Sequence, residues 1–140
     1  MRLSLEEYHA AKVEIRENGY VIFTTYKDPW GVSDMEDEYR AVRAHRDSVD
    51  HVVHVLLDVS QAHSVPPGLM RARQNPNLTH PTKGYIAIVG ASSLLKTMGE
   101  VILRLSHNKE AGFFKTEEDA WTFLRRLLAK AEIEKAPATP

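Results

Sequence analysis

The chain is most constrained by the apolar run at residues 52–57, VVHVLL, which Asp58 ends. The run is mostly β-branched, and apart from His54 it does not alternate with polar residues. This pattern is typical of a strand covered on both faces, as in a parallel sheet between layers of helices. A polar connection follows at residues 61–64, and Pro66-Pro67 opens a predicted helix, where a missing N–H costs nothing. The connection is therefore expected at the carboxyl end of a central strand, where open α/β sheets place their sites.

The N-terminal half predicts a hairpin and then a helix. Asn18-Gly19 lies between two β-rich runs over residues 11–26, and both residues tolerate the positive φ of a type I′ turn. Ser33 and Glu36 form a capping box for a helix that ends near Asp47. The buried face of this helix is predicted to consist of Met35, Tyr39 and Val42.

The C-terminal half alternates strands with helices. After the central strand, a helix is predicted over residues 67–74, with Ser64 as its N-cap. A strand at residues 85–89 leads into a third helix, and a strand at residues 112–114 leads into a final helix capped by Thr116. Strands that alternate with helices pair in parallel, so the chain is predicted to be α/β. The apolar stripe of the third helix comprises Leu94, Met98, Val101, Ile102 and Leu105.

Size and composition restrict the classes of function. A chain of 140 residues is predicted to form a single domain over residues 1–131, followed by a flexible tail over residues 132–140. The net charge of −1 argues against a broad nucleic-acid-binding surface, which needs clustered positive charge. The absence of cysteine excludes disulfides, thiolate zinc sites and cysteine nucleophiles. No apolar run approaches membrane-spanning length and no signal peptide is recognised, so a cytoplasmic location is expected.

Five short stretches between residues 12 and 131 follow one another in a fixed order. They are the hairpin around Asn18-Gly19, VLLDVS at residues 55–60, Pro66-Pro67-Gly68-Leu69, His80-Pro81 through Gly84-Tyr85, and FFKTEEDAWTFL at residues 113–124. In this order they resemble the STAS-type α/β domains, and more closely the SpoIIAA-like branch of small bacterial proteins. The resemblance implies a mixed sheet of four or five strands packed with four helices. It also implies a non-catalytic role in binding a partner protein or a small apolar ligand.

One departure from that family concerns regulation. The phosphoswitch members carry an Asp-Ser-Ser-Gly-Leu type turn where this chain has Pro66-Pro67-Gly68-Leu69. The phosphate-accepting serine is therefore missing, and phosphorylation of this turn is not expected. Ser60 and Ser64 are nearby hydroxyls, but neither occupies the matching place.

Histidine is the first candidate for chemistry, since the chain has seven. His54 and Asp58 share one face of the central strand, because their separation is even. His63 and His80 are both expected near the carboxyl end of the sheet. No HxH or HxxxH spacing is present, and no metal site is predicted.

The turn before the third helix is the second candidate. Gly90-Ala91-Ser92-Ser93-Leu94 has the strand–turn–helix context of a nucleophile elbow, but it lacks the second glycine that the sharp turn needs. Ser92 or Ser93 is therefore interpreted as the cap of the third helix. An anion bound by the free backbone N–H groups at this helix start stays open as an alternative.

Two candidate sites and three hypotheses about function follow. The first hypothesis is a non-catalytic, STAS-like regulatory module that recognises a protein partner without a phosphoacceptor serine, needs no cofactor and forms a homodimer. The alternatives are a carrier of a small apolar, lipid-like ligand held between the sheet and the third helix, and an enzyme that uses His63 or His80. The predicted binding surface consists of Asp58, Ser60, His63, Ser64, Pro66, Pro67, Gly68, Ser92 and Ser93. The predicted apolar pocket consists of Trp30, Leu69, Leu94, Leu95, Met98 and Ile102.

Overall fold

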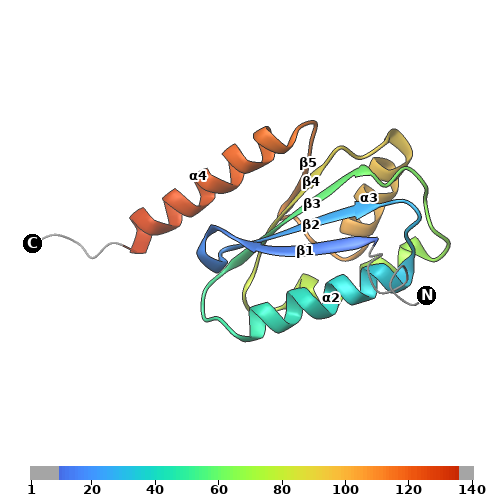
Figure 1. Ribbon diagram of the computed structural model, residues 1–140. Helices are drawn as coiled ribbons and strands as arrows, with labels where there is room; N and C mark the ends of the chain where they lie inside the picture. The colour runs from blue at the N-terminus through green and yellow to red at the C-terminus, as the bar shows by residue number, and fades with distance from the viewer. Residues whose placement is uncertain (1–9, 136–140) are drawn as a thin grey trace, which may run out of the picture.

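The computed structural model describes residues 10–135, which form one five-stranded sheet with helices on both faces (Figure 1). The strands lie side by side in chain order: β1 (Ala11–Arg16), β2 (Val21–Lys27), β3 (Val53–Gln61), β4 (Lys83–Val89) and β5 (Ala111–Phe114). β1 and β2 are antiparallel, and every other neighbouring pair is parallel. The α-helices of this part of the chain are α2 (Val32–Asp47), α3 (Ser93–Leu105) and α4 (Glu117–Lys135). The predicted α/β class with a mixed sheet is confirmed.

The hairpin of β1 and β2 is present, but its turn is longer than predicted. The last paired residues are Arg16 and Val21, so four residues form the turn. Asn18 and Gly19 have the expected positive φ of 55° and 90°, and Glu17 also has a positive φ of 51°. The two-residue type I′ turn was therefore a wrong prediction. Glu17 is held in its position from outside the hairpin, because its carboxylate accepts a hydrogen bond of 2.6 Å from Arg125 Nε on α4.

Local capping explains where the α-helices begin. Ser92 accepts a hydrogen bond of 3.3 Å from the Leu95 N–H, which confirms the predicted cap of α3. The predicted cap of α4 is confirmed as well, since the Asp119 N–H donates to Thr116 Oγ1 at 3.1 Å. The capping box predicted at Ser33 and Glu36 is wrong by two residues. α2 is capped at Gly31, whose N–H donates to the Asp34 carboxylate at 2.8 Å.

The predicted second helix is not an α-helix. Two short 3-10 helices, η2 (Leu69–Gln74) and η3 (Pro76–Thr79), occupy this stretch. Gly68 has a φ of 82° and Pro76 follows η2 closely, so the sequence leaves too little length for a regular α-helix. Ser64 does not act as the N-cap, because its hydroxyl donates to Asp28 instead.

Each face of the sheet has its own core, because side chains alternate along the strands. α4 covers one face, and α2, α3 and η2 cover the other (Figure 1). The first core contains Val21, Phe23, Leu56, Ala87, Val89, Ala120, Trp121 and Leu124. The second contains Tyr26, Met35, Val59, Ala62, Leu69, Leu95 and Ile102, and continues under α2 as Ile22, Val42, Val53 and Val55.

The ends of the predicted domain differ from the structure in one respect. α4 continues to Lys135, so the predicted tail at residues 132–140 begins inside this helix. Its last turns extend beyond the sheet (Figure 1). Residues 1–9 and 136–140 lie outside the described residues. Between residues 10 and 135, no helix combines the length and the apolar composition that a membrane span requires.

Candidate functional site

A cavity of about 160 Å³ lies on the face of the sheet that α2 and α3 cover. β3 and β4 supply its floor, the two helices supply its walls, and the stretch of η2 and η3 closes another side. Most of its lining is apolar, and four aromatic rings contribute to it. These rings belong to Tyr26, Trp30, Tyr39 and Phe113.

The structure brings four of the six predicted pocket residues to this cavity. Trp30, Leu69, Leu95 and Ile102 all line it. Met98 packs against the same core without lining the cavity. Leu94 is 60% exposed, so its assignment to the pocket was wrong. α3 turns Leu95 and Ile102 toward the sheet, and the predicted apolar stripe is therefore only partly buried.

Glu38 is a buried carboxylic acid in the wall of the cavity. Its side chain accepts a hydrogen bond of 3.1 Å from the Thr24 hydroxyl on β2. Burial raises the pKa of Glu38 to about 7, although Thr24, Arg46 and Tyr26 all act in the opposite direction. The cavity therefore contains a group whose charge changes near neutral pH.

Arg46 is a buried cation in the same wall, two helical turns beyond Glu38. Only 3% of the surface of Arg46 is exposed. Nη1 donates to the Asn77 carbonyl at 3.1 Å and Nη2 donates to the Val53 carbonyl at 2.8 Å. Both partners are neutral, and Arg46 forms no ion pair with any residue in the described range. Its Nε is buried and has no hydrogen-bond partner among these residues.

Asn77 lies beside Arg46 and lines the cavity from η3. Its Nδ2 donates to the Tyr39 carbonyl at 2.9 Å and to Asn75 Oδ1 at 3.1 Å. Both partners can only accept, which fixes the orientation of the amide. Its Oδ1 is consequently turned away from them, and it is buried without a partner within residues 10–135.

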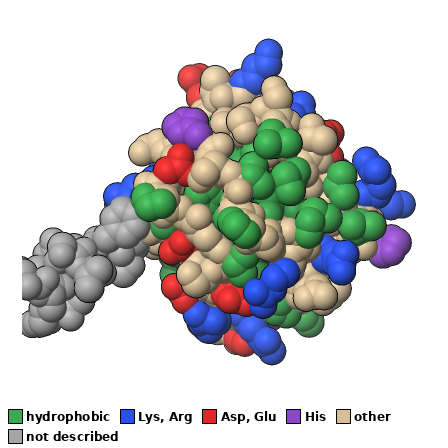
Figure 2. Space-filling view, turned by 90° about the vertical axis from the view of Figure 1, so that its right-hand side faces the viewer, with side chains coloured by type: hydrophobic (Ala, Val, Ile, Leu, Met, Phe, Trp, Pro, Cys, Tyr) green, Lys and Arg blue, Asp and Glu red, His purple; other side chains and the backbone are tan. Residues whose placement is uncertain are grey.

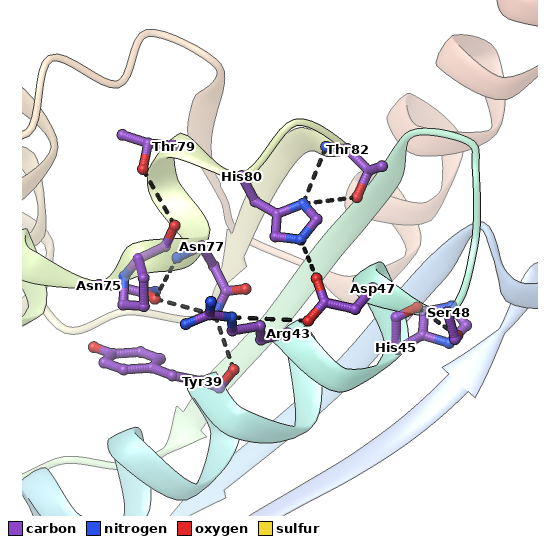
Figure 3. A network of polar contacts seen from close by, with 11 residues as sticks. Tyr39, Arg43, His45, Asp47, Ser48, Asn75, Asn77, Thr79, His80 and Thr82 are labelled. Atoms are coloured by element: carbon purple, nitrogen blue, oxygen red, sulfur yellow. Dashed lines mark hydrogen bonds and ion pairs between the residues drawn. The ribbon is translucent and has the colours of Figure 1, made fainter.

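Hydrogen bonds and an ion pair connect the residues around η3 to the C-terminal half of α2 (Figure 3). His80 Nδ1 accepts from the Thr82 N–H at 3.1 Å, so the proton of the neutral ring is on Nε2. Nε2 then donates to Asp47 Oδ1 at 2.7 Å. Arg43 approaches the other oxygen of Asp47 at 3.8 Å. The wall that carries Asn77 is thus held to α2 at both Tyr39 and Asp47.

The predicted binding surface is an ordered set of loops at the carboxyl edge of the sheet. Asp28 organises it, because its carboxylate accepts from the Ser64 hydroxyl at 2.7 Å and from the His63 N–H at 2.8 Å. These hydrogen bonds, led by that of Ser64, lower the pKa of Asp28. Trp30 Nε1 donates to the Ser64 carbonyl at 2.8 Å, which connects the surface to the rim of the cavity.

Hydrogen bonds and packing contacts join predicted surface residues in two groups, His63 and Ser64 at Asp28, and Asp58 and Ser60 beside Gly90. β3 continues to Gln61, so Asp58 and Ser60 belong to the strand, where Ser60 donates to Asp58 at 2.7 Å. Ser60 packs directly against Gly90, which places it beside the start of α3. Pro66 is buried, so its assignment to the surface was wrong. The exposed members are Ser60, His63, Ser64, Pro67, Gly68, Ser92 and Ser93.

The histidines do not gather at one place. His63 contacts Asp28 at the carboxyl edge, whereas His80 precedes β4 and lies at the amino edge, so the prediction that both share one edge was wrong. His54 is buried and its Nδ1 accepts from the Tyr85 N–H at 2.8 Å. In the described part of the chain, no three His, Asp or Glu side chains converge as metal ligands would.

The polar residues of the cavity were not found from the sequence. Glu38 follows Met35 by three positions and Arg46 follows Val42 by four, so both continue the apolar stripe of α2. That spacing was the available signal. Comparison with known proteins assigns no family, since no family model, no curated protein and no solved structure matches this chain.

Proposed function

We propose that the protein is a non-catalytic binder or carrier of a small apolar molecule, held in the cavity between the sheet, α2 and α3. The observation that carries the proposal is a mostly apolar cavity of about 160 Å³. Apolar cavities of about 150 Å³ in other proteins stay dry and bind molecules as large as benzene. Binding a short acyl chain or a single ring is therefore within its capacity. The resemblance to the SpoIIAA-like proteins agrees with this proposal.

Two tryptophans allow a direct test. Trp30 lines the cavity and Trp121 belongs to the core under α4. In Trp121→Phe, where Trp30 is the only tryptophan, 1-hexanol should produce a saturable change in emission. In the matched variant Trp30→Phe, the same titration should leave the emission of Trp121 unchanged. Equal responses, or none in either variant, would contradict the proposal.

A cavity-filling pair of variants provides a second test. Ala72 lines the cavity and Ala44 is exposed on α2. Ala72→Leu should weaken 1-hexanol binding several-fold, whereas Ala44→Leu should leave it unchanged. Native mass spectrometry of freshly purified protein should in addition detect a retained small molecule, which Ala72→Leu should diminish.

A second candidate function is recognition of a second copy of the chain through α3. Leu94, Met98, Val101 and Leu105 follow the 4-3-4 spacing of residues that pack between two helices. Leu94 is 60% and Leu105 is 50% exposed. Hydrophobic side chains also gather on the side of the molecule that faces right in Figure 1 (Figure 2). This spacing and exposure favour a symmetric dimer, the commonest oligomer of soluble proteins.

Sedimentation velocity tests whether the protein forms a dimer through α3. The unaltered protein should sediment as a dimer, and Leu94→Asp should convert it to a monomer. Ile133→Asp is the matched control, because Ile133 is 75% exposed on α4 and lies outside the α3 stripe. A monomeric unaltered protein at micromolar concentration would eliminate the candidate.

A further inference from the structure

We propose that Arg46 is the head-group site of the cavity and that the ligand is a small apolar molecule ending in a carboxylate. This inference rests on the proposed function, since it adds a chemical class to the molecule that the cavity holds. It assigns the guanidinium to the ligand's charged end and the apolar lining to its body.

The first argument is the unbalanced charge of Arg46. A buried guanidinium is costly unless an anion pairs with it. Arg46 is 3% exposed, and its two hydrogen-bond acceptors are the neutral carbonyls of Asn77 and Val53. Its charge acts on the surroundings, because it contributes, after burial itself, to the lowered pKa of His54. A ligand carboxylate supplies the missing counter-charge.

The second argument is the geometry of the free donor. Nη1 and Nη2 each donate one of their two N–H groups to a main-chain carbonyl, and these bonds orient the guanidinium plane from η3 and β3. Nε keeps its N–H without a partner among the described residues. A carboxylate accepts such charge-assisted hydrogen bonds more strongly than a neutral oxygen does. Arg46 lines the cavity and its Nε is itself buried, so a ligand carboxylate must displace neighbouring atoms to reach this N–H.

The third argument concerns Glu38, the cavity's own carboxyl group. It lies two turns before Arg46 on α2, with Val42 between them, and the two side chains form no ion pair. Its raised pKa of about 7 means that at neutral pH much of the protein carries a protonated Glu38. Glu38 therefore neutralises the positive charge of Arg46 only in the fraction of molecules in which it is ionised, and it does so without direct contact.

Three probes of equal chain length test the inference in the Trp121→Phe protein at pH 6.5: hexanoate, 1-hexanol and hexylamine. Hexanoate should bind at least about tenfold more tightly than 1-hexanol, and hexylamine should bind most weakly. Arg46→Met should abolish the preference for hexanoate over 1-hexanol. Arg46→Lys, which keeps a charge but lacks Nε, should show an intermediate preference.

A measurement on the unaltered protein covers the case in which Arg46→Met does not fold. The carbon-13 signal of carboxyl-labelled hexanoate reports the pKa of the bound acid. Beside Arg46, this pKa should lie below that of free hexanoate, whereas an apolar site without a cation would raise it. A raised pKa, or equal affinity for hexanoate and 1-hexanol, would overturn the inference and leave the proposed function standing. Failure of all three probes to bind would instead overturn the proposed function.

Discussion

Glu38 is the residue at which burial and charge oppose each other most directly. Its pKa is raised from 4.5 to about 7 by burial. The unfolded chain therefore releases this proton near pH 4.5, while the folded protein keeps it until about pH 7. Between these values the folded state binds more protons than the unfolded state, so the free energy of unfolding falls as pH rises.

Glu38→Gln should remove this dependence, because the amide has the same shape and no titration. In the unaltered protein the group should lower the free energy of unfolding by about 3 kcal/mol between pH 4.5 and 7. Urea unfolding at pH 5 and pH 8 measures the difference. Glu100→Gln removes an exposed carboxyl of α3 and should keep the pH slope of the unaltered protein. An unchanged slope in Glu38→Gln would show that Glu38 is ionised throughout.

The same titration should govern the binding of an acid at Arg46. The groups that act on Glu38 are Thr24 and Tyr26 on β2 and Arg46 on its own helix. Once Glu38 ionises, its charge compensates Arg46 and repels a carboxylate. Hexanoate affinity should therefore fall several-fold from pH 6 to pH 8.5, and Glu38→Gln should bind equally well at both. The affinity for 1-hexanol serves as the control and should not follow this profile.

Burial of apolar residues at these sites was predictable from the sequence, and burial of charged ones was not. Trp30 was expected to pack over a core edge, and Leu95 and Ile102 were expected to lie under the third helix because its apolar residues recur at helical spacing. The sequence alone favours solvent exposure of Glu38 and Arg46, since charged residues are rarely fully buried even when they continue an apolar stripe. Only their partners on other elements, Thr24 and Asn77, explain how they are accommodated.

At the scale of elements, the stretch of η2 and η3 is the wall with the weakest internal structure. Short 3-10 helices have poor hydrogen-bond geometry, so this wall depends on its attachments to α2. His80 provides one attachment through Asp47, and Asn77 provides another through the Tyr39 carbonyl. Any ligand exchange is therefore expected to involve this wall.

His80→Ala should loosen the wall without removing a cavity-lining side chain. Loss of the hydrogen bond to the Asp47 carboxylate should lower the free energy of unfolding by about 1–2 kcal/mol. Amide hydrogen exchange over residues 69–80 should accelerate more than in the strands. Thr79→Ala is the control, because Thr79 is exposed and its hydroxyl contacts only the Pro76 carbonyl within η3. Unchanged exchange in His80→Ala would show that the other attachments to α2, through Asn77, Arg46 and Arg71, are sufficient to order the wall.

Two helix caps that form between neighbouring residues were predicted correctly, whereas the cap of α2 and the turn near Glu17 were not. The caps at Ser92 and Thr116 follow from neighbouring residues and were confirmed. The turn at Glu17, which was predicted wrongly, includes a hydrogen bond from Arg125, more than one hundred residues away in the sequence. The surface-facing side of α3 could not be predicted either, because a stripe of apolar residues does not tell which of its edges faces the sheet.

At the scale of the whole molecule, the two cores share one sheet. Leu56 and Val55 are adjacent on β3, and they belong to the core under α4 and the core under α2 respectively. Loss of either core therefore removes the support of the same strand. The domain should unfold as one cooperative unit, as most single domains of this length do.

Leu124→Ala tests this coupling, because Leu124 is fully buried in the core under α4. The truncation should cost about 2–5 kcal/mol. Trp121 lies in the altered core and Trp30 lies on the opposite face, so single-tryptophan variants report each face separately. Both probes should show the same lower urea midpoint. Ile133→Ala on the exposed part of α4 should change the free energy of unfolding by no more than about 0.5 kcal/mol with either probe. If Trp121 shifted while Trp30 kept its midpoint, α4 would be a separate unit and the cavity face would fold without it.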